Sequence, residues 1–376
     1  MTLLSDDQKM LQETAASFLA HEGSIEQQMR HWRDIGCKDG FGHGLWKRFA
    51  DLGLSSICIP TSHDGAGLGV TEGALVLEEI GRNLTPSPFL TTAIVAARAI
   101  EGTEHADRWY PSILSGEAVL ALAIDEGPGH APELSALEAR RQGNGFVLSG
   151  SKQFVVHGGS ADMIVTAART SGSPGSRNGL TLFAIPRDLA GLRIDNVGLV
   201  DSSKAARMEF DGARLDADAV IGGVDEGWRP LGSALAAGRT GAAAELVGVA
   251  SGASAMTLRY LSDRQQFGKR IGEFQALQHR AAHLYGEIEI ARAAVLKASS
   301  LLDCGHPDAE LYTSVAKAKA ASVASLAVRE GVQMHGGIGM TDEHDIGLFM
   351  KREAVLGQLF GDSFYHRERV AALSGY

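Results

Sequence analysis

Three long alanine-rich segments near the end of the chain place the strongest constraint on its fold. They run from Ser233 to Leu261, from Phe274 to Leu302 and from Asp308 to Met334. Helices of this length with small residues on one face pack closely side by side, which is typical of a four-helix bundle. The sequence therefore predicts a helical bundle in its last third.

The rest of the chain consists of two long segments in which apolar residues recur at different spacings. Before residue 118 apolar residues recur at helical spacing, and Ser5 is placed to cap the first helix. After residue 118 the period becomes two, in short runs separated by Gly, Asn and Ser. The clearest runs, which we predict to be strands, are 146–156, 163–169 and 180–186.

No helix-length pattern interrupts these runs, so an antiparallel barrel or sandwich is favoured over a parallel sheet. At 376 residues the chain is too long for one ordinary core. We therefore predict an α+β fold of three domains. They are an N-terminal helical domain (1–117), a middle antiparallel β-barrel domain (118–226) and a C-terminal four-helix bundle (227–376).

Composition excludes several classes of partner. The chain has 35 basic and 45 acidic residues, a net charge of −10, which argues against nucleic acid or an anionic membrane surface. We see no apolar stretch long enough to cross a bilayer and no signal peptide at the start, and we expect a cytoplasmic protein. The cysteines Cys37, Cys58 and Cys304 are far apart, and His279 and His283 lack a further ligand motif. We therefore predict neither a disulfide framework nor a metal site.

Two segments carry the residues best suited to bind a ligand. One is the run from Gln333 to Gly339, which contains two adjacent glycines, and the other is the run from Arg264 to Gly268. A glycine pair lets the backbone press against a flat or phosphorylated ligand. An arginine and several amides supply fixed donors for a pyrophosphate.

At this spacing the two segments resemble the flavin-binding signatures of the acyl-CoA dehydrogenase family. The order of helices, strands and bundle is similar to the family's architecture, so the resemblance covers nearly the whole chain. It implies FAD as cofactor, with the adenine dinucleotide half bound across a subunit interface. The residues placed at that half are Arg264, Phe267, Gln275, Gln333, Gly336 and Gly337.

The resemblance also places residues near the flavin ring. Phe154 and Val156 align with residues beside the ring, and Ser363 falls in the matching C-terminal segment. Relatives often carry a hydroxyl residue where this chain has Val156. A valine cannot hydrogen-bond flavin N5, so the tuning of electron transfer differs here.

The catalytic base is missing from both of its customary positions. Dehydrogenation of a saturated acyl thioester needs a carboxylate to take the α-proton while the flavin accepts the β-hydrogen. Many relatives carry that glutamate where this chain has Gly361. Other branches carry it immediately before an arginine that matches Arg239, and here that neighbour is Gly238.

Two carboxylates could substitute for the missing base. Asp362 adjoins the vacant position, and Glu245 lies on the same helical face as Gly238 but about 10 Å further along the axis. Each also has a structural interpretation: Asp362 could cap the terminal helix, and Glu245 could pair with a basic residue of a neighbouring helix. A third alternative is that this subunit has no base, with Arg239 still orienting the active-site helices.

The resemblance implies an FAD-dependent acyl-CoA dehydrogenase of fatty acid or lipid catabolism, alone or as one subunit of a heteromeric enzyme. Its expected partners are an acyl-CoA substrate, electron-transfer flavoprotein as acceptor, and further chains in a homo- or hetero-tetramer. Two alternatives stay open. One is a non-catalytic partner subunit that completes another chain's flavin site, and the other is a flavin monooxygenase on the same fold.

Overall fold

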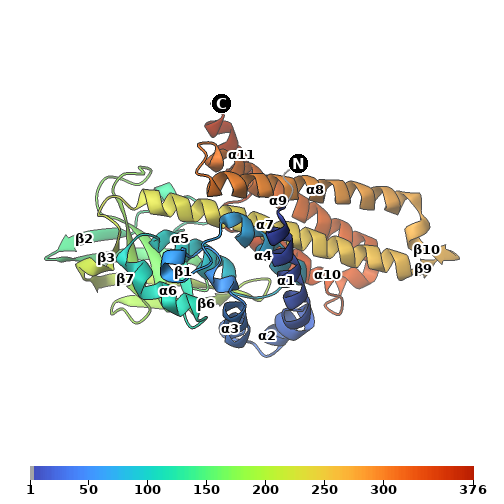
Figure 1. The fold of residues 1–376 in the computed structure, drawn as a ribbon, viewed down its shortest axis with the longest axis horizontal. Helices are drawn as coiled ribbons and strands as arrows, with labels where there is room; N and C mark the ends of the chain where they lie inside the picture. Colours follow the sequence, from blue (N-terminus) through green and yellow to red (C-terminus); the bar gives the residue numbers. More distant parts are fainter. Residues whose placement is uncertain (1–3) are drawn as a thin grey trace. The chain divides into compact units, whose positions relative to one another are not determined.

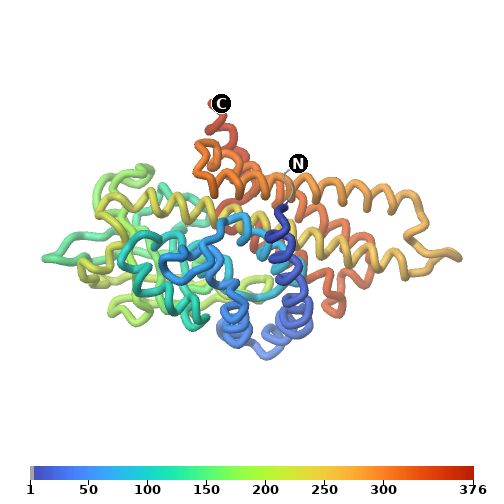
Figure 2. The backbone as a smooth tube through the Cα atoms, in the orientation of Figure 1, coloured from blue at the N-terminus to red at the C-terminus, as the bar shows by residue number. Residues whose placement is uncertain are grey.

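The computed structural model describes residues 4–376 (Figures 1 and 2). The chain packs as two compact units. Unit 1 combines the chain up to His31 with Val70–Pro86 and Arg239–Tyr376, and unit 2 combines Trp32–Gly69 with Ser87–Gly238. The N-terminal helices are thus shared between the units, whereas the division into three consecutive segments stays a prediction.

Unit 1 is helical. Its main helices are α1 (Asp6–Glu22), α4 (Val70–Asn83), the greater part of α7 (Trp228–Asp263), α8 (Gln275–Asp303), α9 (Ala309–His335), α10 (Ile346–Gln358) and α11 (Ser363–Leu373). Shorter helical segments are the π-helix η1 (Ile25–Arg30) and the 3-10 helices η7 (Ile271–Glu273) and η8 (Gly336–Met340). A two-stranded hairpin, β9 (Gln265–Gln266) with β10 (Lys269–Arg270), joins α7 to α8. Figure 1 shows α8 and α9 lying alongside each other. The predicted C-terminal bundle is confirmed, because each alanine-rich segment forms one long helix.

Local signals start the first helix as predicted. The Ser5 hydroxyl accepts from the backbone N–H of Gln8, and the Gln8 side chain accepts from the Ser5 N–H. This capping box satisfies two donors that the first turn leaves without helical partners.

Glycine allows α4 and α7 to approach closely. A Cβ added at Gly81 would lie 2.1 Å from the carbonyl oxygen of Glu245, and one at Gly248 would lie 1.9 Å from that of Glu78. No side chain fits at such distances, so the two backbones touch directly. The Glu78 carboxylate then accepts from Arg292 of α8 at 2.9 Å, which ties a third helix to the pair.

Unit 2 contains one sheet and several helices. The helical segments are α3 (His43–Asp51), η2 (Leu54–Ser56), η3 (Thr61–His63), η4 (Phe89–Ala96), α5 (Ala97–Ile100), α6 (Glu104–Leu114), η5 (Pro132–Leu134) and η6 (Ala217–Ala219), and α2 (His31–Asp34) starts in unit 1. The strands are β1 (Leu120–Ala123), β2 (Glu138–Gln142), β3 (Gly145–Val156), β4 (Met163–Arg169), β5 (Leu180–Pro186), β6 (Leu192–Gly198), β7 (Lys204–Leu215) and β8 (Val220–Ile221). The three strands expected from the period of two are confirmed as β3, β4 and β5.

The sheet is mixed rather than purely antiparallel. Its order is β6-β7-β3-β2-β4-β5-β8, and β1 pairs with β4. The pairs of β1 and β2 with β4 are parallel, whereas the other pairs are antiparallel. The path ends at β6 and β8, so closure into a barrel stays a prediction. Buried apolar side chains fill the interior, with the rings of Phe146 and Phe183 in edge contact at 5.1 Å.

Helix α7 corrects one expectation about membranes. By length and composition it is apolar enough to cross a bilayer, contrary to the sequence analysis. However, 78% of its most apolar window is buried within the protein, as in the core helix of a globular protein. Its apolar residues therefore serve packing.

Candidate active site

The first predicted ligand segment lies on the hairpin that follows α7. Arg264 comes directly after the helix, and its carbonyl accepts from the Ile271 N–H, which closes the hairpin. Phe267 occupies the turn with φ of 56° and is 89% exposed. Its ring makes an edge contact with Phe274, at 6.1 Å between centroids. A large apolar side chain held this far out is suited to contact a ligand or another subunit.

The second predicted segment begins where α9 ends. Gly336 has φ of 65° and ψ of −141°, a conformation that side chains with a Cβ rarely adopt. A Cβ at Gly336 or Gly337 would have no neighbour within 4 Å, so the backbone here faces open space. Gln333, in the last turn of α9, is also exposed. The backbone of the glycine pair is therefore open to solvent, and its contact with a ligand stays a prediction.

Contacts between the helix ends bring these two segments into one region. Tyr260 in the last turn of α7 stacks on His335, the last residue of α9, with ring centroids 4.5 Å apart. Arg264 follows Tyr260 after one turn, and Gly336 follows His335 directly. Tyr260 is not among the site residues predicted from the sequence. The sequence feature that could have identified it is an aromatic residue one helical turn before Arg264.

His335 and His344 form a compact pair beside the glycines. Their ring centroids are 4.4 Å apart, and Nδ1 of His335 contacts the carbonyl of Gly331 at 2.7 Å. Burial lowers the pKa of both imidazoles, which favours the neutral rings. Within residues 4–376, the buried Nε2 of His335 has no hydrogen-bond partner.

These residues fit the dinucleotide half of FAD. Arg264, Gln275 and Gln333 are exposed, and in the part of the chain that the structure describes their side chains have no hydrogen-bond or ion-pair partner. Donors kept on the surface beside bare glycine backbone suit a pyrophosphate and its attached ribose. Gln275 is the first residue of α8, so it belongs to a helix N-terminus, where anionic groups bind favourably.

In unit 2, the residues predicted beside the flavin ring lie at an irregularity of β3. The register of β3 against β7 shifts between Lys152 and Val155, and Phe154 in this bulge has φ of 55°. Bulges of this kind redirect side chains and are frequent next to active sites. Phe154 lines a cavity of about 160 Å³ together with residues of β6 and β7. Val156 ends the strand and is half-buried.

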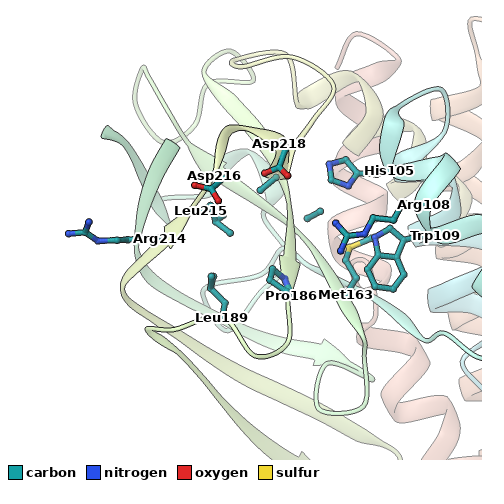
Figure 3. A pocket seen from close by; sticks show the side chains of 12 residues that line it. His105, Arg108, Trp109, Met163, Pro186, Leu189, Arg214, Leu215, Asp216 and Asp218 are labelled. Carbon is teal, nitrogen blue, oxygen red and sulfur yellow. The ribbon is translucent and has the colours of Figure 1, made fainter. Parts of the chain in front are cut away.

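A second cavity of unit 2 contains none of the predicted site residues. It measures about 230 Å³ and lies between α6 and the sheet. Figure 3 shows Arg108 and Trp109 of α6 on one side and Asp216 and Asp218 on the other. Arg214 points away from it (Figure 3). The predicted flavin and catalytic residues therefore lie elsewhere.

Gly361, the residue at the position where the resemblance expects a glutamate, has an unusual backbone geometry. This glycine is buried and has φ of 105°, and Phe360 before it has φ of 60°. A Cβ at residue 361 would lie 2.4 Å from Cδ1 of Tyr365. The Tyr365 ring thus occupies the first atom position of any side chain at this residue.

Both substitute carboxylates make structural contacts. Asp362 is the N-cap of α11, and its Oδ1 accepts from the N–H of Tyr365 at 2.8 Å. Glu245 is 2% exposed, and its Oε1 accepts from Nε of Arg352 on α10 at 2.8 Å. These contacts agree with the structural interpretation of each residue. A role as base stays a prediction for both.

Lys317, which the sequence analysis did not consider, holds the backbone around Gly361. It is fully buried in α9 and donates to the carbonyls of Leu356, Gly357 and Gly361 at 3.0, 3.1 and 2.9 Å. The first two carbonyls belong to the last turn of α10, which lacks helical partners for them. The sequence feature that could have identified Lys317 is a single lysine among the small residues on one face of an alanine-rich helix.

Arg239 and Ser363 lie next to the segment around Gly361. Arg239 is 3% exposed and donates from Nη2 to the hydroxyl of Tyr365 at 3.2 Å. Its guanidinium carbon lies 5.7 Å from the centroid of the Tyr365 ring. Ser363 is the first residue of α11, directly after the Asp362 cap.

Comparison with known proteins identifies the family. The models for the acyl-CoA dehydrogenase N-terminal, middle and C-terminal domains match residues 5–117, 122–213 and 225–374. The chain is 33% identical over 322 residues to cyclohex-1-ene-1-carbonyl-CoA dehydrogenase of Geobacter metallireducens, covering 83% of this chain and 84% of the relative. It is 27% identical to mitochondrial isovaleryl-CoA dehydrogenase of Pongo abelii, over 96% of this chain and 90% of the relative.

Comparison with solved structures leads to the same family. A variant of the Tcur3481-Tcur3483 steroid ACAD superposes with a TM-score of 0.87 at 28% identity, covering 98% of both chains. Members of the matched family are FAD flavoproteins, and the exposed donors and bare glycine backbone described above fit that cofactor. The protein is a member of the acyl-CoA dehydrogenase family with FAD as its cofactor.

Proposed function

We propose that this chain is one subunit of a heteromeric FAD-dependent acyl-CoA dehydrogenase and that a homologous chain supplies the catalytic carboxylate. The observation that carries the proposal is the geometry at Gly361. The residue has no side chain, its φ of 105° disfavours one, and the ring of Tyr365 fills the adjacent space. Asp362 and Glu245 are engaged in a helix cap and an ion pair.

The proposed division of labour follows from the chemistry. FAD, when bound, accepts the β-hydrogen of the acyl group. In this chain, Arg264, Gln333 and the glycine pair would hold the dinucleotide. Arg239 and Lys317 would keep the segment around Gly361 in place. The α-proton would be taken by a glutamate of the homologous chain, because a positioned base contributes about 10²–10⁴ in rate and residue 361 of this chain is a glycine.

The relatives support a ring-containing acyl group as substrate. The relative from Geobacter metallireducens is named for a cyclohexene carboxylic thioester, and the superposed structure is named as a steroid ACAD made of two components. We propose a bulky cyclic acyl-CoA thioester as the substrate class and electron-transfer flavoprotein as the acceptor.

The test compares the purified chain alone with the chain co-expressed with a homologue that carries glutamate at the position of Gly361. Both preparations are given straight-chain and ring-containing acyl-CoA thioesters with an artificial electron acceptor. We expect turnover by the lone chain to be at least about 100-fold below that of the pair. The matched control is the same pair with the homologue's glutamate changed to glutamine, which should return the rate to that of the lone chain.

The other outcomes separate the alternatives. Robust turnover by the lone chain would reject a heteromeric role. A chain that binds no FAD yet raises the activity of the homologue would be a non-catalytic structural partner. Rapid reoxidation by air with a hydroxylated product would identify a monooxygenase.

A further inference from the structure

Tyr365 lies where a catalytic side chain at residue 361 would have to begin. A Cβ at this position would be 2.4 Å from Cδ1 and 3.0 Å from Cε1 of the Tyr365 ring, and 3.0 Å from Nε2 of His366. Ordinary carbon contacts are about 3.5–4.0 Å, so the ring and a side chain at 361 exclude each other. The near edge of the ring, rather than a flexible tip, makes this contact.

The ring of Tyr365 is fixed at both ends. Its backbone N–H donates to the Asp362 cap at 2.8 Å, which sets the start of α11. Its hydroxyl accepts from the buried Arg239 at 3.2 Å, and the guanidinium lies over the ring at 5.7 Å. Moving the ring away would break the contact with a buried cation, which is costly.

The backbone of Gly361 is fixed from the opposite direction. Lys317 donates to its carbonyl at 2.9 Å, and Nε2 of His366 contacts the carbonyl of Phe360 at 3.0 Å. Lys317 and His366 are both fully buried. Neither the glycine nor the tyrosine can therefore retreat without disturbing buried polar contacts.

We propose that Tyr365, held by Arg239, is a positioning residue whose ring fills and seals the place of the lost carboxylate. This proposal rests on the proposed function, in which position 361 faces the acyl group. Loss of a glutamate side chain would leave a gap large enough for water beside Arg239. An aromatic ring fills that gap and keeps water out of the acyl site. A single Gly361→Glu change would then fail to restore a base, because the ring already occupies its path.

The test is a double-mutant cycle on thermal unfolding of the full chain. Gly361→Ala, Tyr365→Ala and the double variant are compared with the wild type. Gly175→Ala is the matched control, because Gly175 has a similar φ, at 97°, and a Cβ there would meet no atom closer than 3.9 Å. We expect Gly361→Ala to lower the Tm by at least about 4 °C more than Gly175→Ala, since it adds a steric clash to the same backbone strain.

The cycle should also show coupling. In the Tyr365→Ala background, the excess cost of Gly361→Ala over Gly175→Ala should shrink to what the approach to His366 causes. If Gly361→Ala does not fold, recovery of a folded double variant gives the same support. An excess that is absent, or that is equally large without the tyrosine ring, would overturn the proposal.

A second readout separates the sealing role from the proposed function. With FAD bound and air excluded, acyl-CoA should bleach the flavin absorbance of the lone Gly361→Glu/Tyr365→Ala variant and not that of Gly361→Glu alone. Bleaching by Gly361→Glu alone would overturn the sealing role. Steric coupling without bleaching in the double variant would instead count against the acyl site at residue 361, and thus against the proposed function.

Discussion

At the scale of single residues, Lys317 is the clearest case of buried charge used for structure. Its ammonium group has three donors and meets three backbone carbonyls. Burial, the largest cause, lowers its pKa from 10.5 to about 7, while Asp362 and Glu353 raise it and Arg239 lowers it. The segment at Gly361 is therefore held by a lysine whose charge changes near neutral pH.

This gives a pH-dependent stability with a defined sign. Between about pH 7 and 10.5 the unfolded chain binds more protons at Lys317 than the folded chain does. The free energy of unfolding should therefore rise with pH in this window, by at most about 1.4 kcal/mol per pH unit from this group. Urea unfolding of wild type and Lys317→Met at several pH values isolates the effect. The wild type should gain stability relative to the variant above about pH 7, and a pH-independent difference would contradict the assignment.

At the scale of secondary-structure elements, the crossing of α4 and α7 depends on backbone contact. Gly81 and Gly248 each face a carbonyl oxygen of the opposite helix at a distance that excludes a Cβ. The Arg292 contact with Glu78 lies at the same crossing. The positions of α4 and α7 therefore depend on glycines that allow backbone contact as well as on apolar packing.

Replacing Gly248 by alanine should separate the two helices. The added methyl would meet the Glu78 carbonyl at 1.9 Å, so we expect a loss of roughly 2–3 kcal/mol in the free energy of unfolding. Gly286→Ala, in α8, is the matched control, because a Cβ there meets nothing within 4 Å. That change should stabilise the protein by up to about 1 kcal/mol through helix propensity. Equal effects of the two substitutions in urea unfolding would rule out close contact between α4 and α7.

At the scale of the whole molecule, unit 1 presents several large apolar side chains to solvent. Phe267, Met340, Phe364 and Tyr285 are 89, 78, 72 and 64% exposed. Phe267 lies on the hairpin that the family resemblance places at a flavin site shared between subunits. Such exposure within one chain is expected of a subunit of the heteromeric enzyme that we propose.

Phe267→Ser should therefore act on assembly rather than on folding. An exposed side chain contributes little to the fold, so the free energy of unfolding of the isolated chain should change by less than about 0.5 kcal/mol. We expect smaller species in analytical ultracentrifugation and a lower FAD content after gel filtration. Leu134→Ser, at a residue of unit 2 that is 58% exposed, should change neither. A variant with full FAD content and unchanged assembly would remove Phe267 from the proposed interface.

Much of the fold follows from local patterns. The capping box at Ser5, the three alanine-rich helices and the strands β3 to β5 are encoded by neighbouring residues, because helix and strand periods are local properties. Arg264, Gln333 and the glycine pair could be chosen as candidate ligand contacts from the sequence alone, since a glycine pair and amides have the same chemistry in any context; their contact with the flavin stays a prediction. The absence of glutamate at Gly361 needs no structure at all.

Only the tertiary structure decided what replaces that glutamate. Lys317 meets Gly361 across 44 positions, and Arg352 meets Glu245 across 107. The parallel pairing of β1 with β4 and the shared packing of the N-terminal helices have the same origin. These contacts join residues whose proximity depends on how helices and strands pack, which no local period encodes. The sequence by itself determined which elements form and which cofactor chemistry is present, whereas packing decided that the ring of Tyr365 lies against Gly361.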